Sequence, residues 1–176
     1  MLRLPRHGDV IRHAEAARGR RARALRKLRP HPGPRLKTLR LYTDGGARGN
    51  PGPAGLGVVI EDENGMRLRG LRRFLGKATN NEAEYEALIE GLKAVSEWKP
   101  DRLEILLDSK LVVEQVNGRW KVKEARLQTL LAKAKELLAA FPEVEIKQVA
   151  RARNKGADAL ANMAMDEHVK KPKVAG

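Results

Sequence analysis

The chain has 176 residues, no cysteine and a formal net charge of +14, and its hydrophobic content of 41% fits one globular domain with some additional chain. The lack of cysteine excludes disulfide bonds and thiolate metal sites, and no apolar run is long enough for a membrane helix or a secretory signal. The basic excess favours a polyanionic partner, most simply a nucleic acid, and we expect a cytoplasmic protein.

Residues 1–37 form a strongly basic segment with twelve Lys or Arg residues and two acidic residues. The segment contains Pro30, Pro32 and Pro34 and no aromatic residue, so it lacks the apolar side chains needed for a core of its own. We interpret it as a flexible basic arm. Two alternatives remain open: a transit peptide, which the scarcity of serine disfavours, and an extension upstream of the native start.

The next residues predict a strand that ends at a carboxylate. Residues 39–43 alternate in polarity and include Leu, Tyr and Thr, which indicates a β-strand ending at Asp44. Five glycines and two prolines follow within 45–55, which predicts a tight loop whose backbone can approach a ligand closely. Taken alone, Asp44 also fits a turn aspartate that hydrogen-bonds its own backbone.

Two further strands, over 56–61 and 66–75, are predicted to complete an antiparallel meander. A helix over 79–98 then begins with a capping box, in which Thr79 is the N-cap and Glu82 stands three residues later. Glu84 lies at the edge of the apolar stripe of this helix and points towards the sheet. Helix geometry leaves two readings open for Glu84, a solvated partner of the helix dipole and a functional carboxylate.

The second half of the chain alternates between helices and strands. An apolar strand over 103–107 precedes Asp108 and Ser109, either of which fits the N-cap of a short helix over 110–116. A basic segment over 119–123 contains Trp120. An amphipathic helix over 125–140, a strand over 144–149 and a helix over 155–165 follow, with Asp158 in the first turn of the last helix. We interpret 166–176 as a Lys-rich, frayed C-terminal tail.

The order β-β-β-α-β-α-α-β-α predicts one α/β domain over 38–165 with a mixed five-stranded sheet. Asp44 and Asp108 follow strands, while Glu84 and Asp158 lie in first turns of helices, and ligands of such sheets gather at the carboxyl ends of parallel strands. Four converging acids repel one another unless a cation lies among them, and carboxylates suit Mg²⁺ or Mn²⁺. A basic protein with such a cluster suggests metal-assisted phosphodiester chemistry.

Segments of the chain from about 38 to 165 resemble ribonuclease H type I. They are Tyr42-Thr43-Asp44-Gly45-Gly46, Gly49-Asn50-Pro51-Gly52, Thr79-Asn80-Asn81-Glu82-Ala83-Glu84, Asp108-Ser109 and Asn154-Lys155-Gly156-Ala157-Asp158-Ala159-Leu160-Ala161. The resemblance implies a ribonuclease H-like fold and an enzyme that hydrolyses the RNA strand of RNA/DNA hybrids, leaving 5′-phosphate and 3′-hydroxyl ends. It also implies that Asp44, Glu84, Asp108 and Asp158 are catalytic and hold two Mg²⁺ ions roughly 4 Å apart, with Mn²⁺ as a substitute.

The same resemblance implies a set of substrate-binding residues. Those in the glycine-rich segment and at the helix start would contact the minor groove, where the 2′-hydroxyl distinguishes RNA from DNA. Asn80 and Asn81 also fit helix capping, and Lys77 and Thr79 resemble a pocket for a phosphate of the DNA strand. The full set is Gly45, Gly46, Asn50, Lys77, Thr79, Asn80, Asn81, Ser109 and Trp120.

The chain departs from the family pattern in three places. Only Arg119–Lys123 remains of a basic protrusion that carries several tryptophans in many bacterial members. No His lies between His31 and His168, although members often have a catalytic His just before the last helix. Arg151, a better candidate than Arg153, would supply charge stabilisation or assist product release. The arm lacks the aromatic residues of the family's hybrid-binding domain.

We expect a monomer. Two alternative functional classes remain open. One is another nuclease of this fold, such as a junction resolvase or an integrase core, which would share the acids without the Asn-rich contacts. The other is a non-catalytic module that binds hybrids, although all four acids are present.

Overall fold

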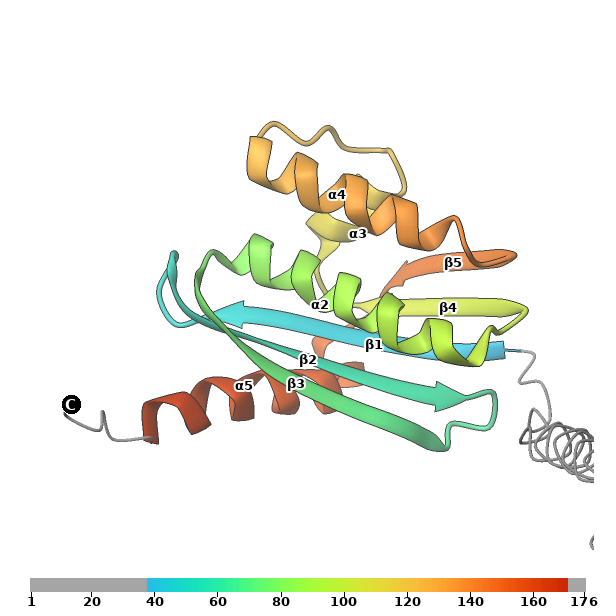
Figure 1. Cartoon of the computed structure of the whole chain (residues 1–176), viewed down its shortest axis with the longest axis horizontal. Helices are drawn as coiled ribbons and strands as arrows, with labels where there is room; N and C mark the ends of the chain where they lie inside the picture. The colour runs from blue at the N-terminus through green and yellow to red at the C-terminus, as the bar shows by residue number, and fades with distance from the viewer. Residues whose placement is uncertain (1–37, 171–176) are drawn as a thin grey trace, which may run out of the picture. The chain divides into compact units, whose positions relative to one another are not determined.

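A computed structural model describes residues 38–170, which form a five-stranded mixed sheet in the order β3-β2-β1-β4-β5 (Figure 1). β1 pairs antiparallel with β2 and parallel with β4; β2–β3 is antiparallel and β4–β5 is parallel. The predicted order of elements is confirmed. The elements are β1 (Thr38–Ala47), β2 (Gly52–Asp62), β3 (Arg67–Ala78), α2 (Asn80–Val95), η1 (Ser96–Trp98), β4 (Arg102–Leu107), α3 (Lys110–Val116), α4 (Ala125–Leu138), β5 (Glu143–Gln148), η2 (Arg151–Arg153) and α5 (Lys155–Lys170).

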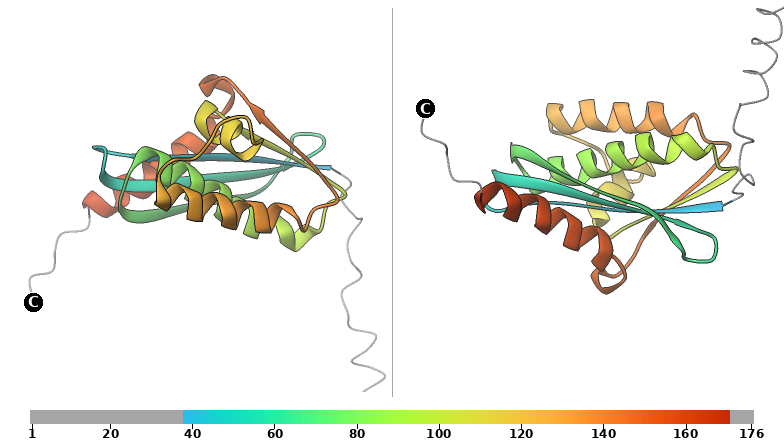
Figure 2. Two further views of the ribbon diagram at one scale, coloured as in Figure 1. Left: turned by 90° about the horizontal axis from the view of Figure 1, so that it is seen from above. Right: turned by 60° about the horizontal axis from the view of Figure 1, so that its bottom comes forward.

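Helices cover both faces of the sheet. α2, α3 and α4 lie on one face, and α5 lies on the other, against β1, β2 and β3 (Figure 2). Among the described helices none is both long enough and apolar enough to span a membrane. The basic arm assigned to 1–37 lies outside the described residues.

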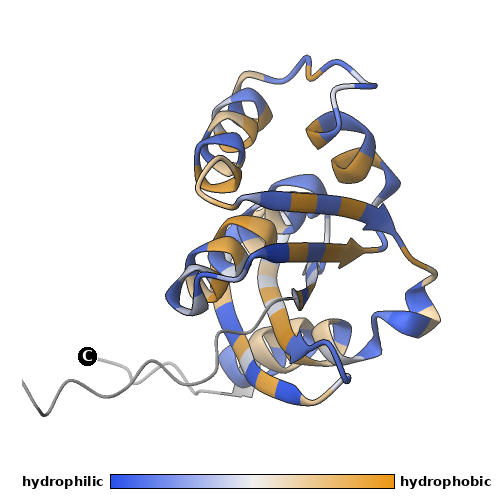
Figure 3. Cartoon of the chain, turned by 90° about the vertical axis from the view of Figure 1, so that its right-hand side faces the viewer, coloured by the Kyte–Doolittle hydropathy of each residue, from blue (hydrophilic) through white to orange (hydrophobic). Residues whose placement is uncertain are grey.

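The main core lies between the sheet and α2. Hydrophilic and hydrophobic residues alternate along the strands (Figure 3). The hydrophobic residues of the central strands, such as Leu41 and Ile105, are fully buried, while those of β3 and β5 are partly buried. Tyr85 of α2 is also fully buried, and its hydroxyl donates a hydrogen bond to Gln115 Oε1 at 2.8 Å. Burial raises the pKa of Tyr85 to about 12, so this hydroxyl keeps its proton and serves as a donor.

The predicted capping box at the start of α2 is confirmed. The Thr79 hydroxyl accepts a hydrogen bond from the Glu82 N–H at 3.2 Å, and Glu82 Oε2 accepts one from the Thr79 N–H at 2.8 Å. Two orphan backbone donors are thereby satisfied, and the orientation of the first turn is fixed. This matters for the site because Glu84 lies just beyond that turn.

The prediction that the first strand ends at Asp44 is wrong, because β1 continues to Ala47. Gly45 and Gly46 pair with Leu56 and Gly55 of β2 instead of forming a loop. An added Cβ on Gly45 would lie 2.1 Å from the backbone carbon and oxygen of Ala83. The absence of a side chain at Gly45 therefore allows β1 to approach α2 closely. Asp44 lies inside the strand and not at its end.

The last helix extends to Lys170, beyond the predicted end at Met165. Three contacts hold its final turn against the sheet. Asp166 pairs with Arg48 and Glu167 pairs with Arg72, each at 2.5 Å, and the His168 ring stacks on Phe74 with ring centroids 3.7 Å apart. The part of the predicted tail up to Lys170 is therefore helical; the remainder lies outside the described residues.

Candidate active site

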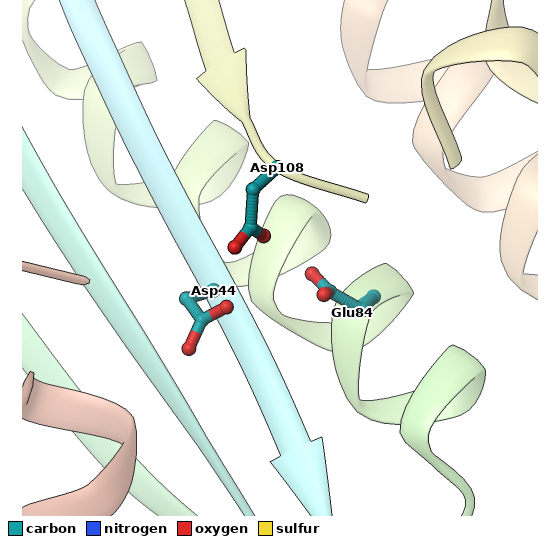
Figure 4. A group of neighbouring side chains, drawn as sticks. All are labelled: Asp44, Glu84 and Asp108. Atoms are coloured by element: carbon teal, nitrogen blue, oxygen red, sulfur yellow. The ribbon is translucent and has the colours of Figure 1, made fainter. Parts of the chain in front are cut away.

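Three carboxylates from three different elements point toward one another (Figure 4). Asp44 lies in β1, Glu84 lies early in α2 and Asp108 follows β4 directly. One carboxylate oxygen from each lies within 4.8 Å of those of the other two. The predicted convergence of these three acids is present in the structure.

The topology of the sheet accounts for this convergence. β1 and β4 are parallel neighbours whose register ends with Tyr42 opposite Leu106, so Asp44 and Asp108 follow the pairing at the same edge. The close approach at Gly45 brings α2, and with it Glu84, against β1. On the opposite face, a Cβ on Gly57 would lie 2.0 Å from the Ala157 carbonyl, so a glycine is needed for α5 to pack on β2.

Burial and mutual repulsion make the charged forms of Asp44 and Glu84 costly. Asp44 is 9% exposed; burial, followed by the charges of Asp108 and Asp158, raises its pKa to about 6. Burial, followed by the charges of Asp44 and Asp108, raises the pKa of Glu84 well above its usual value. Arg151 and the Gly45 N–H act in the opposite direction on both groups.

These residues fit a hard divalent cation. Glu84 Oε2 is buried without a hydrogen-bond partner, which is costly unless a ligand occupies the space beside it. The clustered donors are all carboxylate oxygens, which suit Mg²⁺ or Mn²⁺. A cation here would relieve both the repulsion and the unpaired oxygen.

Asp158, the fourth predicted acid, lies near this group without being part of the trio. Its Oδ1 accepts a hydrogen bond from Arg151 Nη2 at 3.2 Å, and its charge acts on the pKa of Asp44. Arg151 is thus the arginine of η2 that pairs with this carboxylate. The pKa of Arg151 is raised, most strongly by its hydrogen bond to Asp158 and then by the charges of Asp158, Asp108 and Asp44.

Two of the three predicted asparagines form a chain of hydrogen bonds beside the site. Asn80 Oδ1 accepts from the Ala47 N–H at 2.9 Å, and Asn50 Oδ1 accepts from the Asn80 N–H at 3.0 Å. These bonds connect the end of β1, the loop that follows it and the start of α2. Both side chains are exposed, while Asn81 is half-buried.

The remaining predicted substrate residues divide between caps and surface positions. Thr79 and Ser109 are the N-caps of α2 and α3, and the Ser109 hydroxyl accepts from the Val112 N–H at 3.3 Å. Lys77 is exposed at the end of β3. Trp120 is also exposed, with the Lys110 ammonium 5.7 Å from its ring centroid. Gly45 and Gly46 lie in β1.

Sequence reasoning missed two amide side chains that contact the backbone of the site. Asn154 Nδ2 donates to the Thr43 carbonyl at 2.9 Å, and Gln148 Nε2 donates to the Asp108 carbonyl at 3.3 Å. Asn154 was noticed only as part of a motif. An asparagine directly before a helix normally indicates a cap, so nothing in the sequence pointed to a distant carbonyl.

Comparison with known proteins places the chain in a well-populated group. A family model described as "Reverse transcriptase-like" matches residues 42–164. The "Bifunctional protein Rv2228c" of Mycobacterium tuberculosis is 48% identical over 72% of this chain and 35% of its own length. "Ribonuclease HI" of Halobacterium salinarum is 43% identical over 72% of this chain and 63% of its own length. The chain therefore spans less than two thirds of either relative.

One solved structure is similar to this chain over nearly the whole length of the solved protein. The crystal structure of LC11-RNase H1 in complex with an RNA/DNA hybrid has a TM-score of 0.71 and 41% identity, and the match covers 75% of this chain and 99% of that one.

Proposed function

The chain belongs to the ribonuclease H family, and we propose that it is an endonuclease that hydrolyses the RNA strand of RNA/DNA hybrids, leaving 5′-phosphate and 3′-hydroxyl ends. One observation carries the proposal: three acids on separate elements meet beside an exposed pair of asparagines. The hybrid bound in the similar LC11-RNase H1 structure supports the choice of substrate.

We assign the metal to the carboxylates of Asp44, Glu84, Asp108 and Asp158, which would hold two Mg²⁺ ions, with Mn²⁺ as a substitute. When bound, such ions supply Lewis-acid stabilisation and lower the pKa of water that attacks the phosphodiester. The chain itself fixes the positions of the carboxylates. Asp44 and Asp108 are held by the strand register and Glu84 by the capped, glycine-packed helix.

Arg151 contributes a permanent positive charge beside the acids. A guanidinium does not exchange its proton at neutral pH, so Arg151 does not replace a catalytic His as a proton shuttle. Its role in the proposal is to stabilise charge on the phosphate or to assist product release, from a position within hydrogen-bond distance of Asp158.

The asparagines would recognise the 2′-hydroxyl by donating hydrogen bonds to its oxygen. Because Asn50 Oδ1 and Asn80 Oδ1 each accept a bond from the protein, the Nδ2 groups are the ends left to face a ligand. Such donors match acceptor atoms of the RNA strand in a wide minor groove, including the 2′-oxygen. Gly46 and Asn81 are assigned to the same surface.

The DNA strand would lie beside the asparagines, over Lys77 and the N-terminus of α2. Lys77 and the capped N-terminus of α2 at Thr79 suit a phosphate, because a helix N-terminus and an ammonium both attract anions. Trp120 and Ser109 are also assigned to substrate binding. The monomeric state and the cytoplasmic location stay predictions from the sequence.

Cleavage of an end-labelled hybrid in Mg²⁺, beside the same RNA alone, the RNA duplex and the DNA duplex, tests the proposal. We expect cutting of the hybrid RNA strand only. Cutting of duplex DNA would support a resolvase or integrase-like activity, and hybrid binding without cutting would support the non-catalytic module. A DNA duplex with a single embedded ribonucleotide should be cut poorly, because several consecutive 2′-hydroxyls are needed to engage the asparagine donors.

A further inference from the structure

The parallel pairing of β1 with β4 stops just before the acids that these strands carry. Tyr42 and Leu106 are the last residues in register, so the carbonyls beyond them lack strand partners in this pair. β1 stays paired with β2 as far as Ala47 and β4 with β5 as far as Leu107, but the two strands that carry the aspartates are no longer joined to each other, and buried carbonyls here need other hydrogen-bond donors.

Residues 148–154, from the last residue of β5 to the residue before α5, supply such donors. Asn154 Nδ2 donates to the Thr43 carbonyl at 2.9 Å, directly before Asp44. Gln148 Nε2 donates to the Asp108 carbonyl at 3.3 Å, and the Val149 N–H donates to the Leu107 carbonyl at 2.9 Å. One short connection therefore contacts the backbone at both aspartates.

Asn154 is almost completely buried at this position. Its side chain is 1% exposed, and its Oδ1 is buried without a hydrogen-bond partner, so the bond to Thr43 is made at the cost of leaving an acceptor unpaired. The Asn154 carbonyl also accepts the Asp158 N–H at 3.1 Å. The same residue thus contacts the backbone beside Asp44 and the helical turn that carries Asp158.

We propose that Asn154, assisted by Gln148, is a positioning residue that holds the Asp44 and Asp108 backbones at the separation that a divalent cation requires. In this role neither amide needs to contact the substrate. The inference rests on the metal site of the proposed function, but it does not depend on which nucleic acid is cut. Residues that orient metal ligands typically change metal affinity or activity by 10- to 100-fold when they are replaced.

The test is Mn²⁺ binding by calorimetry to the full chain without nucleic acid. Asn154→Leu keeps a branched side chain of similar size and removes the donor, and Gln148→Leu removes the second donor at an exposed position. Gln128→Leu is the matched control, because Gln128 Nε2 donates to the Val122 carbonyl at 2.9 Å on α4, away from the acids.

We expect Asn154→Leu to weaken Mn²⁺ binding by about tenfold or more. Gln148→Leu should weaken it less, and Gln128→Leu should leave it unchanged. In cleavage assays, Asn154→Leu should lower kcat, leave the KM for the hybrid near that of the wild type and recover in part at high metal concentration. A purely structural role would lower the unfolding temperature and leave the metal affinity of the folded protein unaltered.

Wild-type Mn²⁺ affinity in folded Asn154→Leu would overturn the proposal. If that variant does not fold, Gln148→Leu decides, and an affinity equal to that of Gln128→Leu overturns it. A wild-type protein that binds Mn²⁺ but cuts no hybrid would contradict the proposed function alone, because the binding data would still decide the role of the amides.

Discussion

Arg151 Nη2 lies 3.2 Å from Asp158 Oδ1, and this ion pair places a positive charge near the clustered acids. The guanidinium also lowers the pKa of Asp44 and of Glu84, against the larger effects of burial and repulsion. In the metal-free protein Arg151 thus takes part of the electrostatic role that a divalent cation would take.

Replacement of Arg151 should therefore affect catalysis much more than folding. We expect Arg151→Ala to lower kcat by about 10²-fold, the usual loss when one stabilising group is removed, with partial recovery in Arg151→Lys. Arg153→Ala is the matched control, since Arg153 lies in the same short helix, is also exposed and has no ion pair with Asp158. Equal kcat losses in the two alanine variants would remove the specific role from Arg151.

The Gly45 contact predicts a severe effect of one methyl group. In Gly45→Ala the new Cβ would lie 2.1 Å from the Ala83 backbone, so β1 and α2 must separate, at a cost of about 3 kcal/mol or more in unfolding free energy. The Asp44–Glu84 separation should increase with it. Gly46→Ala, whose Cβ would find Met165 Cε at 4.0 Å, is the control. Similar urea unfolding curves for both variants would contradict the close approach.

The raised pKa of Asp44 predicts how metal-free stability depends on pH. The unfolded carboxyl titrates near 3.9 and the folded one at about 6, so below about pH 4 both states are protonated and the group has no effect. As the pH rises through this interval, the unfolded state ionises first and stability falls. The penalty is complete above pH 6, where the folded state must also carry the buried charge.

Asp44→Asn should therefore be more stable than the wild type at pH 7 in chelator, by up to about 2–3 kcal/mol. The difference should disappear near pH 4. Saturating Mg²⁺ should reverse the order, since it binds the wild-type acids and stabilises the folded state. Thermal unfolding in chelator and in Mg²⁺ measures both effects, and identical midpoints in chelator at pH 7 would refute the assigned cause.

The arm over 1–37, which lies outside the described residues, has a net charge of +10 from twelve basic and two acidic residues. If it contacts phosphates, each contact releases counterions, and affinity falls with salt at a slope of about −0.9 per contact. Deletion should then raise KM at moderate salt, flatten the salt dependence and spare kcat. Identical salt slopes with and without the arm would show that it makes no such contacts.

Much of the fold and the acidic cluster could be predicted from local patterns. Alternating strands, the Thr79 capping box and the position of Asp108 after β4 follow from short-range rules, and Asp44, Glu84 and Asp108 meet as expected. Their convergence was predictable because parallel strands place their carboxyl ends at one edge.

The errors arose where tertiary contacts override local preference. Gly45 and Gly46 look like loop residues, yet β2 pairing and the approach of α2 keep them in a strand. The end of α5 depends on Arg48 and Phe74, which lie far away in sequence. The partner of Asn154 is likewise a carbonyl on another element, which no window around Asn154 contains.

Asp108→Asn separates the chemistry from the binding most directly. The substitution keeps the shape of the side chain and removes one carboxylate charge from the trio, while the asparagines and the basic residues that are proposed to bind the hybrid stay intact. Cleavage rate and hybrid Kd should be measured on the same preparation in Mg²⁺. We predict that cleavage falls by about 10²-fold or more while the Kd remains close to that of the wild type. Turnover near the wild-type rate in this variant would contradict the assignment of the carboxylates as the metal site.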